Sequence, residues 1–222
     1  MNKQSLLLVS LIALFFSCSK QKTSTTPEIL KSEEQAKTST DGPTLSANGT
    51  TDTYQLINSV FGGTGDVIEA PDCSHPGFGK HITQVYDNDL KRNVFAFLIH
   101  VSPDNDKCED SDRQRNEIKT YDRSPENLKA SKDERVLYRW KFKLDANFKP
   151  SSDFTHIHQL KPIDGDNQLP IITLTPRYRA AGDVMQVIHT GETDATSQKY
   201  IVSVPLSDFK GQWVEVIERA TF

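Results

Sequence analysis

The sequence predicts an all-β fold, built as a β-sandwich or barrel of short strands. From Tyr54 onward, aromatic and β-branched residues occur in short runs, and segments rich in Gly, Pro, Asn and Asp separate these runs. No segment shows the long apolar periodicity that is typical of a packed helix. A chain of 222 residues has room for one such domain behind a leader.

The expected strands follow one another along the domain. In chain order they cover residues 93–101, 113–121, 136–144, 155–161, 170–175, 184–189, 200–204 and 213–222. Only residues 124–129, which open with Ser-Pro-Glu, suggest a short turn of helix. The clearest alternation places Val136, Tyr138, Trp140, Phe142 and Leu144 on one face and Leu137, Arg139, Lys141 and Lys143 on the other.

Residues 1–17 have the features of an export signal. Lys3 precedes an apolar run over residues 6–16 that is too short to span a bilayer. The run ends at Ser17-Cys18, which resembles a bacterial lipobox and predicts cleavage before Cys18 and a lipid anchor at the outer membrane, facing the periplasm or the cell surface. A plain secretory signal is the alternative. Polar residues 18–53 are expected to form a disordered tether before a domain over residues 54–222.

Export would place the cysteines in an oxidising compartment. Besides Cys18, the chain has only Cys73 and Cys108, and both lie in turn-rich segments. They are expected to pair as a disulfide. Such a bridge would hold the loop that precedes the expected strand at 113–121.

Charge is distributed unevenly along the chain. The net charge of -4 argues against a general nucleic-acid binder. Residues 113–143 nevertheless hold ten Lys and Arg against five acidic residues, a local net charge of +5. A basic region in an acidic protein can steer a polyanion to one site.

The most basic strand is the one expected at 113–121. With the two-residue period of a strand, Arg113, Arg115, Glu117, Lys119 and Tyr121 share one face. This face is expected to line a groove for an anion, together with the cationic face of residues 136–144.

A second polar cluster occurs in the strand expected at 155–161. His156 and His158 are two residues apart and should therefore share a strand face, with Lys161 close behind. A His-x-His pair also suits a metal, which leaves a metal-dependent β-sandwich enzyme as an alternative. Because a complete ligand set of known spacing is missing, the sequence assigns no metal and no cofactor.

Grouped Arg, Lys and His side chains at an anion groove suit β-elimination on a uronic acid. A cation neutralises the carboxylate, a base removes the proton on C5, and an acid protonates the leaving oxygen on C4. The strands do not offer the two carboxylates that glycoside hydrolysis needs. The cations around Glu117 should keep it ionised, so it is expected to orient Arg115 or Lys119.

Two motifs resemble a known family. Arg115-Asn-Glu117-Ile-Lys119 is similar to the Arg-x-Glu-x-Arg strand of jelly-roll polysaccharide lyases, which include alginate lyases, and His156-Ile-His158 is similar to their Gln-Ile-His strand. The runs DRQRNEIKTYDRSPENL, YRWKFKLD, FTHIHQLK and PIITLTPR resemble the jelly-roll ulvan lyases of marine flavobacteria, over residues 70–222. The resemblance implies a concanavalin-like jelly roll that cuts ulvan, a sulfated rhamnose–uronic acid polymer, beside the uronic acid. An ulvan-type substrate would accommodate the two departures from the alginate lyase pattern, Lys119 and His156.

The resemblance also implies a lysine base and a tyrosine acid. Lys161 matches the position of the lysine. The family carries its tyrosine in strands beyond the one that matches residues 213–222, so the jelly roll is expected to lack its last strands. Tyr121, Tyr138 and Tyr178 remain as substitutes for the acid.

These inferences assign expected roles. Lys161 is the base, Arg115 is the partner of a carboxylate or sulfate, His156 and His158 line the groove, and Glu117 orients the cations. Cations for further subsites are Arg113, Lys119, Arg139, Lys141 and Arg177. The expected partners are an anionic polysaccharide and, through Cys18, the membrane. A non-catalytic protein that binds anionic carbohydrate is the first alternative.

Overall fold

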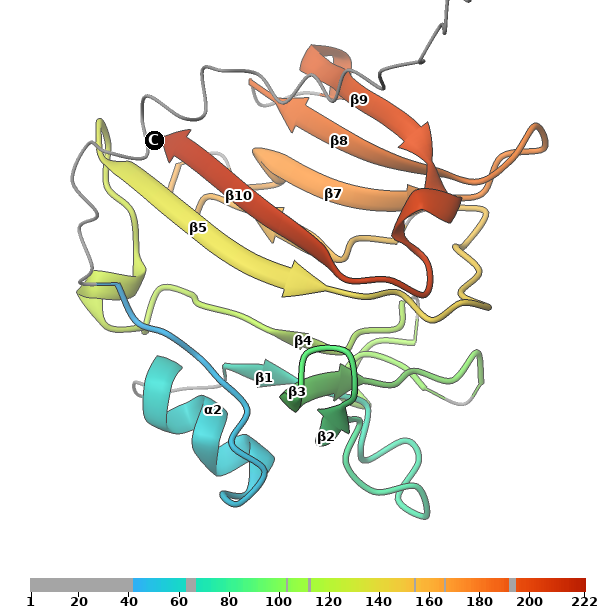
Figure 1. The fold of residues 1–222 in the computed structure, drawn as a ribbon. Helices are drawn as coiled ribbons and strands as arrows, with labels where there is room; N and C mark the ends of the chain where they lie inside the picture. The colour runs from blue at the N-terminus through green and yellow to red at the C-terminus, as the bar shows by residue number, and fades with distance from the viewer. Residues whose placement is uncertain are drawn as a thin grey trace, which may run out of the picture. The chain divides into compact units, whose positions relative to one another are not determined.

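The computed structural model describes residues 42–62, 67–102, 104–111, 113–153, 155–165, 167–191 and 195–222. These residues form antiparallel sheets with one α-helix among them, so the predicted all-β class is confirmed (Figure 1). The jelly-roll connectivity stays a prediction. The export signal over 1–17, Cys18 and the tether up to residue 41 lie outside the described residues. In the part of the chain that is described, no helix is long and apolar enough to cross a membrane.

Within the described residues, ten strands make four antiparallel sheets. The strands are β1 Ile68–Glu69, β2 Ile82–Asp87, β3 Arg92–Phe97, β4 Glu117–Ile118, β5 Arg135–Phe142, β6 His158–Leu160, β7 Ile172–Arg177, β8 Val184–Thr190, β9 Gln198–Pro205 and β10 Val214–Thr221. The largest sheet has the order β6-β7-β8-β9, and β1-β4, β2-β3 and β5-β10 are two-stranded. The helix α2 spans Thr53–Phe61, and short 3₁₀ turns span Glu126–Leu128, Ala195–Ser197 and Leu206–Phe209.

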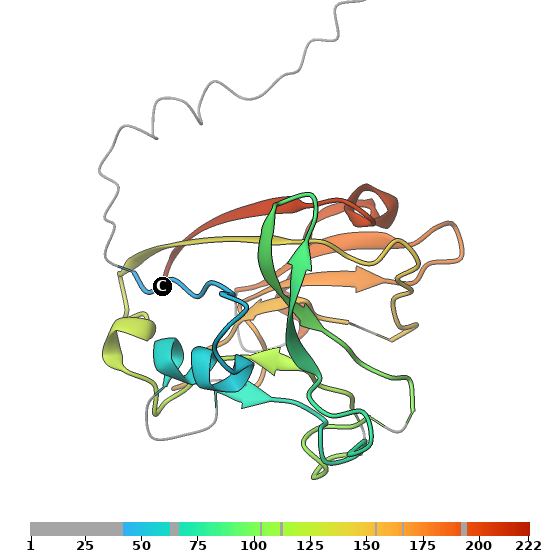
Figure 2. The same cartoon turned by 60° about the horizontal axis from the view of Figure 1, so that its bottom comes forward.

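The β5-β10 ribbon packs against the four-stranded sheet (Figures 1 and 2). The alternation predicted for residues 136–144 is confirmed, because exposed and less exposed residues alternate along the whole of β5. Phe142 on its inner side packs against a core of Leu144, Met185 and Leu206. Burial of these apolar side chains stabilises the two layers against each other.

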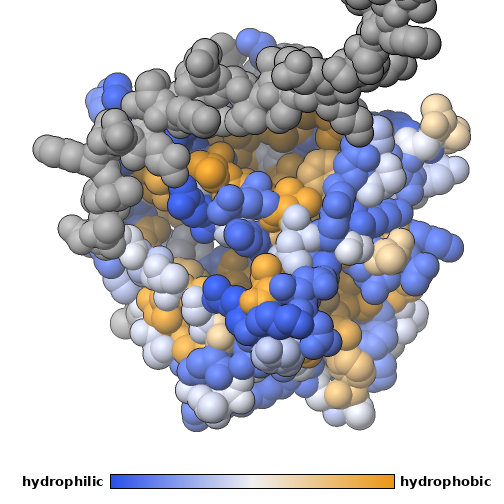
Figure 3. Space-filling model, viewed as in Figure 1, coloured by the Kyte–Doolittle hydropathy of each residue, from blue (hydrophilic) through white to orange (hydrophobic). Residues whose placement is uncertain are grey.

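The outer side of the β5-β10 ribbon is mixed rather than uniformly cationic. Lys141 lies opposite Glu215, and Arg139 lies opposite Ile217. Leu137 and Ile217 are exposed there, and Figure 3 shows hydrophobic side chains among polar ones on the face that is seen in Figure 1. On this side, apolar residues therefore lie among the cations, and the charge of Glu215 offsets that of Lys141.

A second, smaller core forms around α2, which the sequence did not predict. Asp52 caps the helix by accepting hydrogen bonds from the backbone N–H groups of Tyr54 and Gln55. Ile57 is the only large apolar residue of the helix that is fully buried, and it packs with Val67 and Ile82. One buried apolar residue in a nine-residue helix leaves no periodicity for the sequence to show.

Residues just before the helix, which the sequence assigns to the tether, are bound to the folded part. The backbone N–H groups of Asn48 and Gly49 donate to the side-chain oxygen of Gln84 on β2. The Gln84 amide in turn donates to the carbonyl oxygen of Thr51. The described part of this segment therefore extends the small core.

The prediction of a strand over residues 113–121 is wrong for most of its length, since only β4 forms there. Side chains replace the backbone ladder around it. Gln114 donates to the carbonyl oxygens of His100 and Val101, and Asn116 donates to those of His81 and Leu98. Amide side chains that bind neighbouring backbone compete with regular pairing, which a pattern of alternating polarity does not show.

The other expected strands are confirmed with shifted ends. The strand from residue 93 stops at Phe97 instead of Val101, and the one from residue 155 starts at His158. β7, β8, β9 and β10 lie within two residues of their expected limits. The helical turn expected in 124–129 is present as a 3₁₀ turn.

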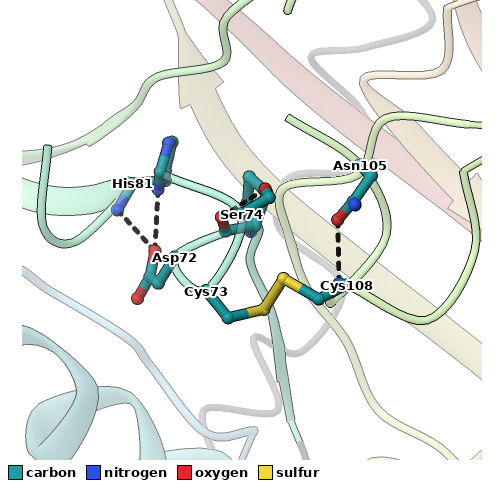
Figure 4. The surroundings of a disulfide bond; sticks show 7 residues. Asp72, Cys73, Ser74, His81, Asn105 and Cys108 are labelled. Atoms are coloured by element: carbon teal, nitrogen blue, oxygen red, sulfur yellow. Dashed lines mark hydrogen bonds and ion pairs between the residues drawn. A yellow bond between two sulfur atoms is a disulfide. The ribbon is translucent and has the colours of Figure 1, made fainter. Parts of the chain in front are cut away.

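The predicted disulfide between Cys73 and Cys108 is present, and their Cα atoms are 6.1 Å apart (Figure 4). It joins the loop after β1 to the loop that precedes β4, across 35 residues. The Cys108 backbone N–H also donates to the Asn105 side chain, which orders the second loop.

Replacing both cysteines, as Cys73→Ser with Cys108→Ser, should lower the free energy of unfolding by about 2–4 kcal/mol. The physical reason is that the unfolded state of the double variant has the conformational freedom that a bridge across 35 residues removes. Urea unfolding of the oxidised wild type and the double variant measures this difference. Equal midpoints for the two proteins would contradict it.

Candidate functional site

Arg115 and Lys119 lie on one side of the chain, as the sequence predicted, but a buried carboxylate holds them. Arg115 Nη1 donates to Glu69 Oε2 at 2.5 Å, and Lys119 donates to the other oxygen, Oε1. Lys107 Nζ is 3.6 Å from the same Oε1. The Glu69 side chain is only 5% exposed. Its charge therefore offsets part of the positive charge of the cations that were expected to bind substrate.

Glu69, and not Glu117, thus orients the cations. Burial opposes ionisation of Glu69, but hydrogen bonds from Lys119 and Arg115 outweigh it and lower its pKa to about 2. Glu117 lies directly opposite Glu69 in the β1-β4 pair. Its pKa is raised, mainly by burial, rather than held down by the cations. The role expected for Glu117 is corrected accordingly.

His156 and His158 do not share a face, because the chain is irregular where β6 begins. The Ile157 N–H donates to the Leu174 carbonyl oxygen, while His158 is itself the register partner of Leu174. His156 Nδ1 lies 2.8 Å from the hydroxyl of Thr175, the next residue on β7. Since neighbouring strand residues point to opposite faces, the two imidazoles lie on opposite sides of the sheet. They are not arranged to hold one metal ion together.

The side of the sheet that His156 occupies is polar and largely buried. Thr173, Thr175 and Gln186 are all buried there. Burial, followed by the charge of Arg177, lowers the pKa of His156. Arg177 itself donates to the backbone oxygen of Asp153 at 3.1 Å.

His158 lies on the other side, between the two layers, where it meets a carboxylate. Its Nε2 is 2.8 Å from Glu218 Oε2 on β10, and both side chains are mostly buried. The Trp140 ring lies beside the imidazole, with 5.2 Å between centroids. Trp140 Nε1 is buried and has no hydrogen-bond partner among the described residues. This arrangement places the His158 imidazole, oriented by Glu218, beside the N–H of Trp140, which is unpaired within the described residues.

A tyrosine completes this group. Tyr138 is the cross-strand partner of Glu218, so both side chains leave the same side of the ribbon. Burial, then the charges of Glu218 and Glu134, raise the pKa of Tyr138. Of the other tyrosines, Tyr178 is 52% exposed. We name His158, Glu218, Tyr138 and Trp140 the interlayer site.

The remaining expected site residues do not gather with it. Arg139 and Lys141 are exposed on the outer side of β5, away from Tyr138 and Trp140. Arg113 is exposed outside any strand. Lys161 follows β6 directly and is exposed, and its side chain forms no hydrogen bond or ion pair within the described ranges. The single groove expected from the sequence is thus divided among several surfaces.

The sequence missed one cluster entirely. His75, His81, His100 and Asp104 bring their side-chain nitrogen and oxygen atoms within 4.8 Å of one another. The only signal in the sequence is that three of the six histidines lie between residues 75 and 100. Their spacing matches no common metal motif, because they come from separate loops around β2 and β3.

The chain matches no family model, no curated protein and no solved structure. Its function is therefore inferred from its own residues and their geometry.

Proposed function

We propose that this protein is a polysaccharide lyase that cleaves ulvan, or a related sulfated uronic acid polymer, by β-elimination. The observation that carries the proposal is the His158–Glu218 pair beside Tyr138. It supplies a base and an acid within one interlayer site. The sulfated uronate polymer is named from the resemblance of the motifs at 115–119 and 156–158 to ulvan lyases.

Glu218 prepares His158 to act as the base. A carboxylate only accepts hydrogen bonds, so the Nε2 of a neutral His158 carries the proton that it donates to Glu218. The lone pair of Nδ1 is then available to take the proton from C5 of the uronic acid. The carboxylate also stabilises the imidazolium that forms.

Tyr138 is suited to be the acid. A tyrosine phenol is protonated at neutral pH, and the raised pKa of Tyr138 extends this to higher pH, so the phenol has a proton to give to the glycosidic oxygen as the C4–O bond breaks. The electron pair of the broken C5–H bond forms the C4–C5 double bond. One proton thus passes to His158 and another leaves Tyr138, and an unsaturated uronate and a free hydroxyl result.

The uronate carboxylate needs a positive partner before its C5 proton becomes acidic. Lys161 follows β6, the strand that begins at His158, and no described acidic residue pairs with it. Lys161 is exposed and does not point into the interlayer site, so in this proposal it reaches the carboxylate from outside the site, whereas the resemblance assigns it the role of base.

Incubation of the purified chain with ulvan tests the proposal. We expect the ultraviolet absorbance of the unsaturated uronate to rise with time and the polymer to shorten. A sulfated galactan without uronic acid is the matched substrate control, because it has the charge but not the acidic C5 proton. Binding of ulvan without any rise in absorbance would replace the lyase by the non-catalytic carbohydrate-binding alternative.

A further inference from the structure

We propose that His75, His81, His100 and Asp104 form a structural zinc site. His75 lies in the loop after β1, His81 directly precedes β2, and His100 and Asp104 follow β3. Three imidazoles and one carboxylate form a complete set of four protein ligands of the types that Zn²⁺ prefers. A full set leaves no position for a substrate, so the role is structural rather than catalytic.

The distances between the ligand atoms suit a tetrahedral ion. Asp104 Oδ2 is 3.0 Å from His100 Nδ1 and 3.2 Å from His81 Nε2. His75 Nδ1 is 3.4 Å from His100 Nδ1 and 3.8 Å from Asp104 Oδ1. Ligands bound to zinc at about 2.05 Å in a tetrahedron are ~3.3 Å apart. Three separations between ligand atoms are thus close to a tetrahedral edge, and all four ligand atoms lie within 4.8 Å of one another.

The contacts of His81 leave its second ring nitrogen facing a carboxylate oxygen. Figure 4 shows the Asp72 carboxylate beside the His81 ring. Nδ1 of this ring lies 2.8 Å from Asp72 Oδ1 and donates its proton there, because a carboxylate only accepts. The Nε2 of the neutral ring then presents a lone pair to Asp104 Oδ2, which is also an acceptor. His81 is fully buried, and Nε2 has no hydrogen-bond partner among the described residues. Two facing acceptors repel each other unless a cation or an extra proton lies between them.

Neighbouring groups support a metal rather than an extra proton. Asp72 on the far nitrogen of His81 is the carboxylate that metal-bound histidines commonly have. The backbone N–H of His100 donates to Asp104 Oδ2 at 2.6 Å and fixes the carboxylate. Asp104 Oδ1 is buried and has no hydrogen-bond partner in the described ranges. The Phe78 ring packs against two of the imidazoles, with its centroid 4.5 Å from that of His100 and 4.8 Å from that of His81.

The position of the site explains what the ion would do. The Cys73–Cys108 bridge holds the same two loops, one carrying His75 and the other following Asp104. The nearby core has only three fully buried apolar residues, Ile57, Val67 and Ile82. A core of this size gains stability from a crosslink or a metal. Zinc would therefore join β2 and β3 to both loops.

Elemental analysis and titration of the full chain with zinc ions test the proposal. We expect one zinc per chain, and Co²⁺ in its place should give the visible absorption of a tetrahedral site. Asp104→Asn and His100→Gln should lose the bound metal. Asp72→Asn, which removes the carboxylate beside His81 Nδ1 and none of the four proposed ligands, should weaken zinc binding about 10–100-fold.

His156→Gln is the matched control, because it removes an imidazole outside the proposed zinc site and should keep one zinc. A wild-type chain that binds no zinc would overturn the proposal without reliance on any variant. Zinc retained in both Asp104→Asn and His100→Gln, or lost in His156→Gln, would overturn it as well. These measurements do not depend on lyase activity, so the two proposals stand or fall separately.

Discussion

Replacing Glu69 by glutamine should lower the free energy of unfolding by about 3 kcal/mol. The substitution keeps the size of the side chain but removes the charge that holds Arg115 and Lys119, and it leaves both cations without their buried partner. The loss is large because the Glu69 side chain is 5% exposed, so water cannot replace the lost interactions. Urea unfolding at neutral pH measures the effect.

The dependence of the free energy of unfolding on pH, below neutral pH, provides a second test of the same residue. The pKa of Glu69 is about 2 in the fold against 4.5 for an ordinary glutamate side chain, so its stabilisation is complete above that ordinary value. It is lost as the pH falls toward 2, where the folded carboxyl takes up a proton. The gap in stability between wild type and Glu69→Gln should therefore narrow below pH 4.5. A gap that stays constant down to pH 2 would refute the assignment.

Glu215→Gln is the matched control for Glu69→Gln. Glu215 is exposed on β10, opposite the exposed Lys141, and loses at most a surface ion pair. We expect a change of less than ~1 kcal/mol and little difference across this pH range. Equal losses for the two variants would mean that burial of Glu69 does not matter.

His158→Gln and Tyr138→Phe should each lower kcat/KM on ulvan about 100–10,000-fold, the range for loss of a general base or acid. Both variants keep most of the volume of the side chain, so binding of the polymer should survive. Kinetics of the unsaturated product, together with a binding assay, measure the two effects. Because the pKa of Tyr138 is raised, the wild type should keep its acid protonated beyond the pH at which a free tyrosine ionises.

Lys161→Ala decides between the two candidate bases. If His158 is the base and Lys161 binds the carboxylate, Lys161→Ala should mainly raise KM. Loss of elimination in Lys161→Ala with near-normal rates in His158→Gln would assign the base to Lys161 instead. His189→Gln, on β8 and outside the interlayer site, is the control and should retain full activity.

Local periodicity in the sequence predicted many of the strands. The two-residue alternation of β5 was visible in the chain because one side of the ribbon packs on the core and the other meets solvent. The same reasoning placed β7 to β10 within two residues. It failed for α2, where a cap and one buried isoleucine are enough to hold the helix. It also failed around β4, where amide side chains do the pairing.

The site depended on contacts between residues far apart in the chain. The sequence placed Arg115 and Lys119 on one side, but their partner Glu69 lies 46 and 50 residues away. His158 was a candidate from its motif, yet Glu218, 60 residues on, was not. The sequence by itself determined the β class, the inner face of β5 and the pair Cys73–Cys108. Only the tertiary structure decided which charges are paired and which histidines converge, because packing sets such contacts and local pattern does not record them.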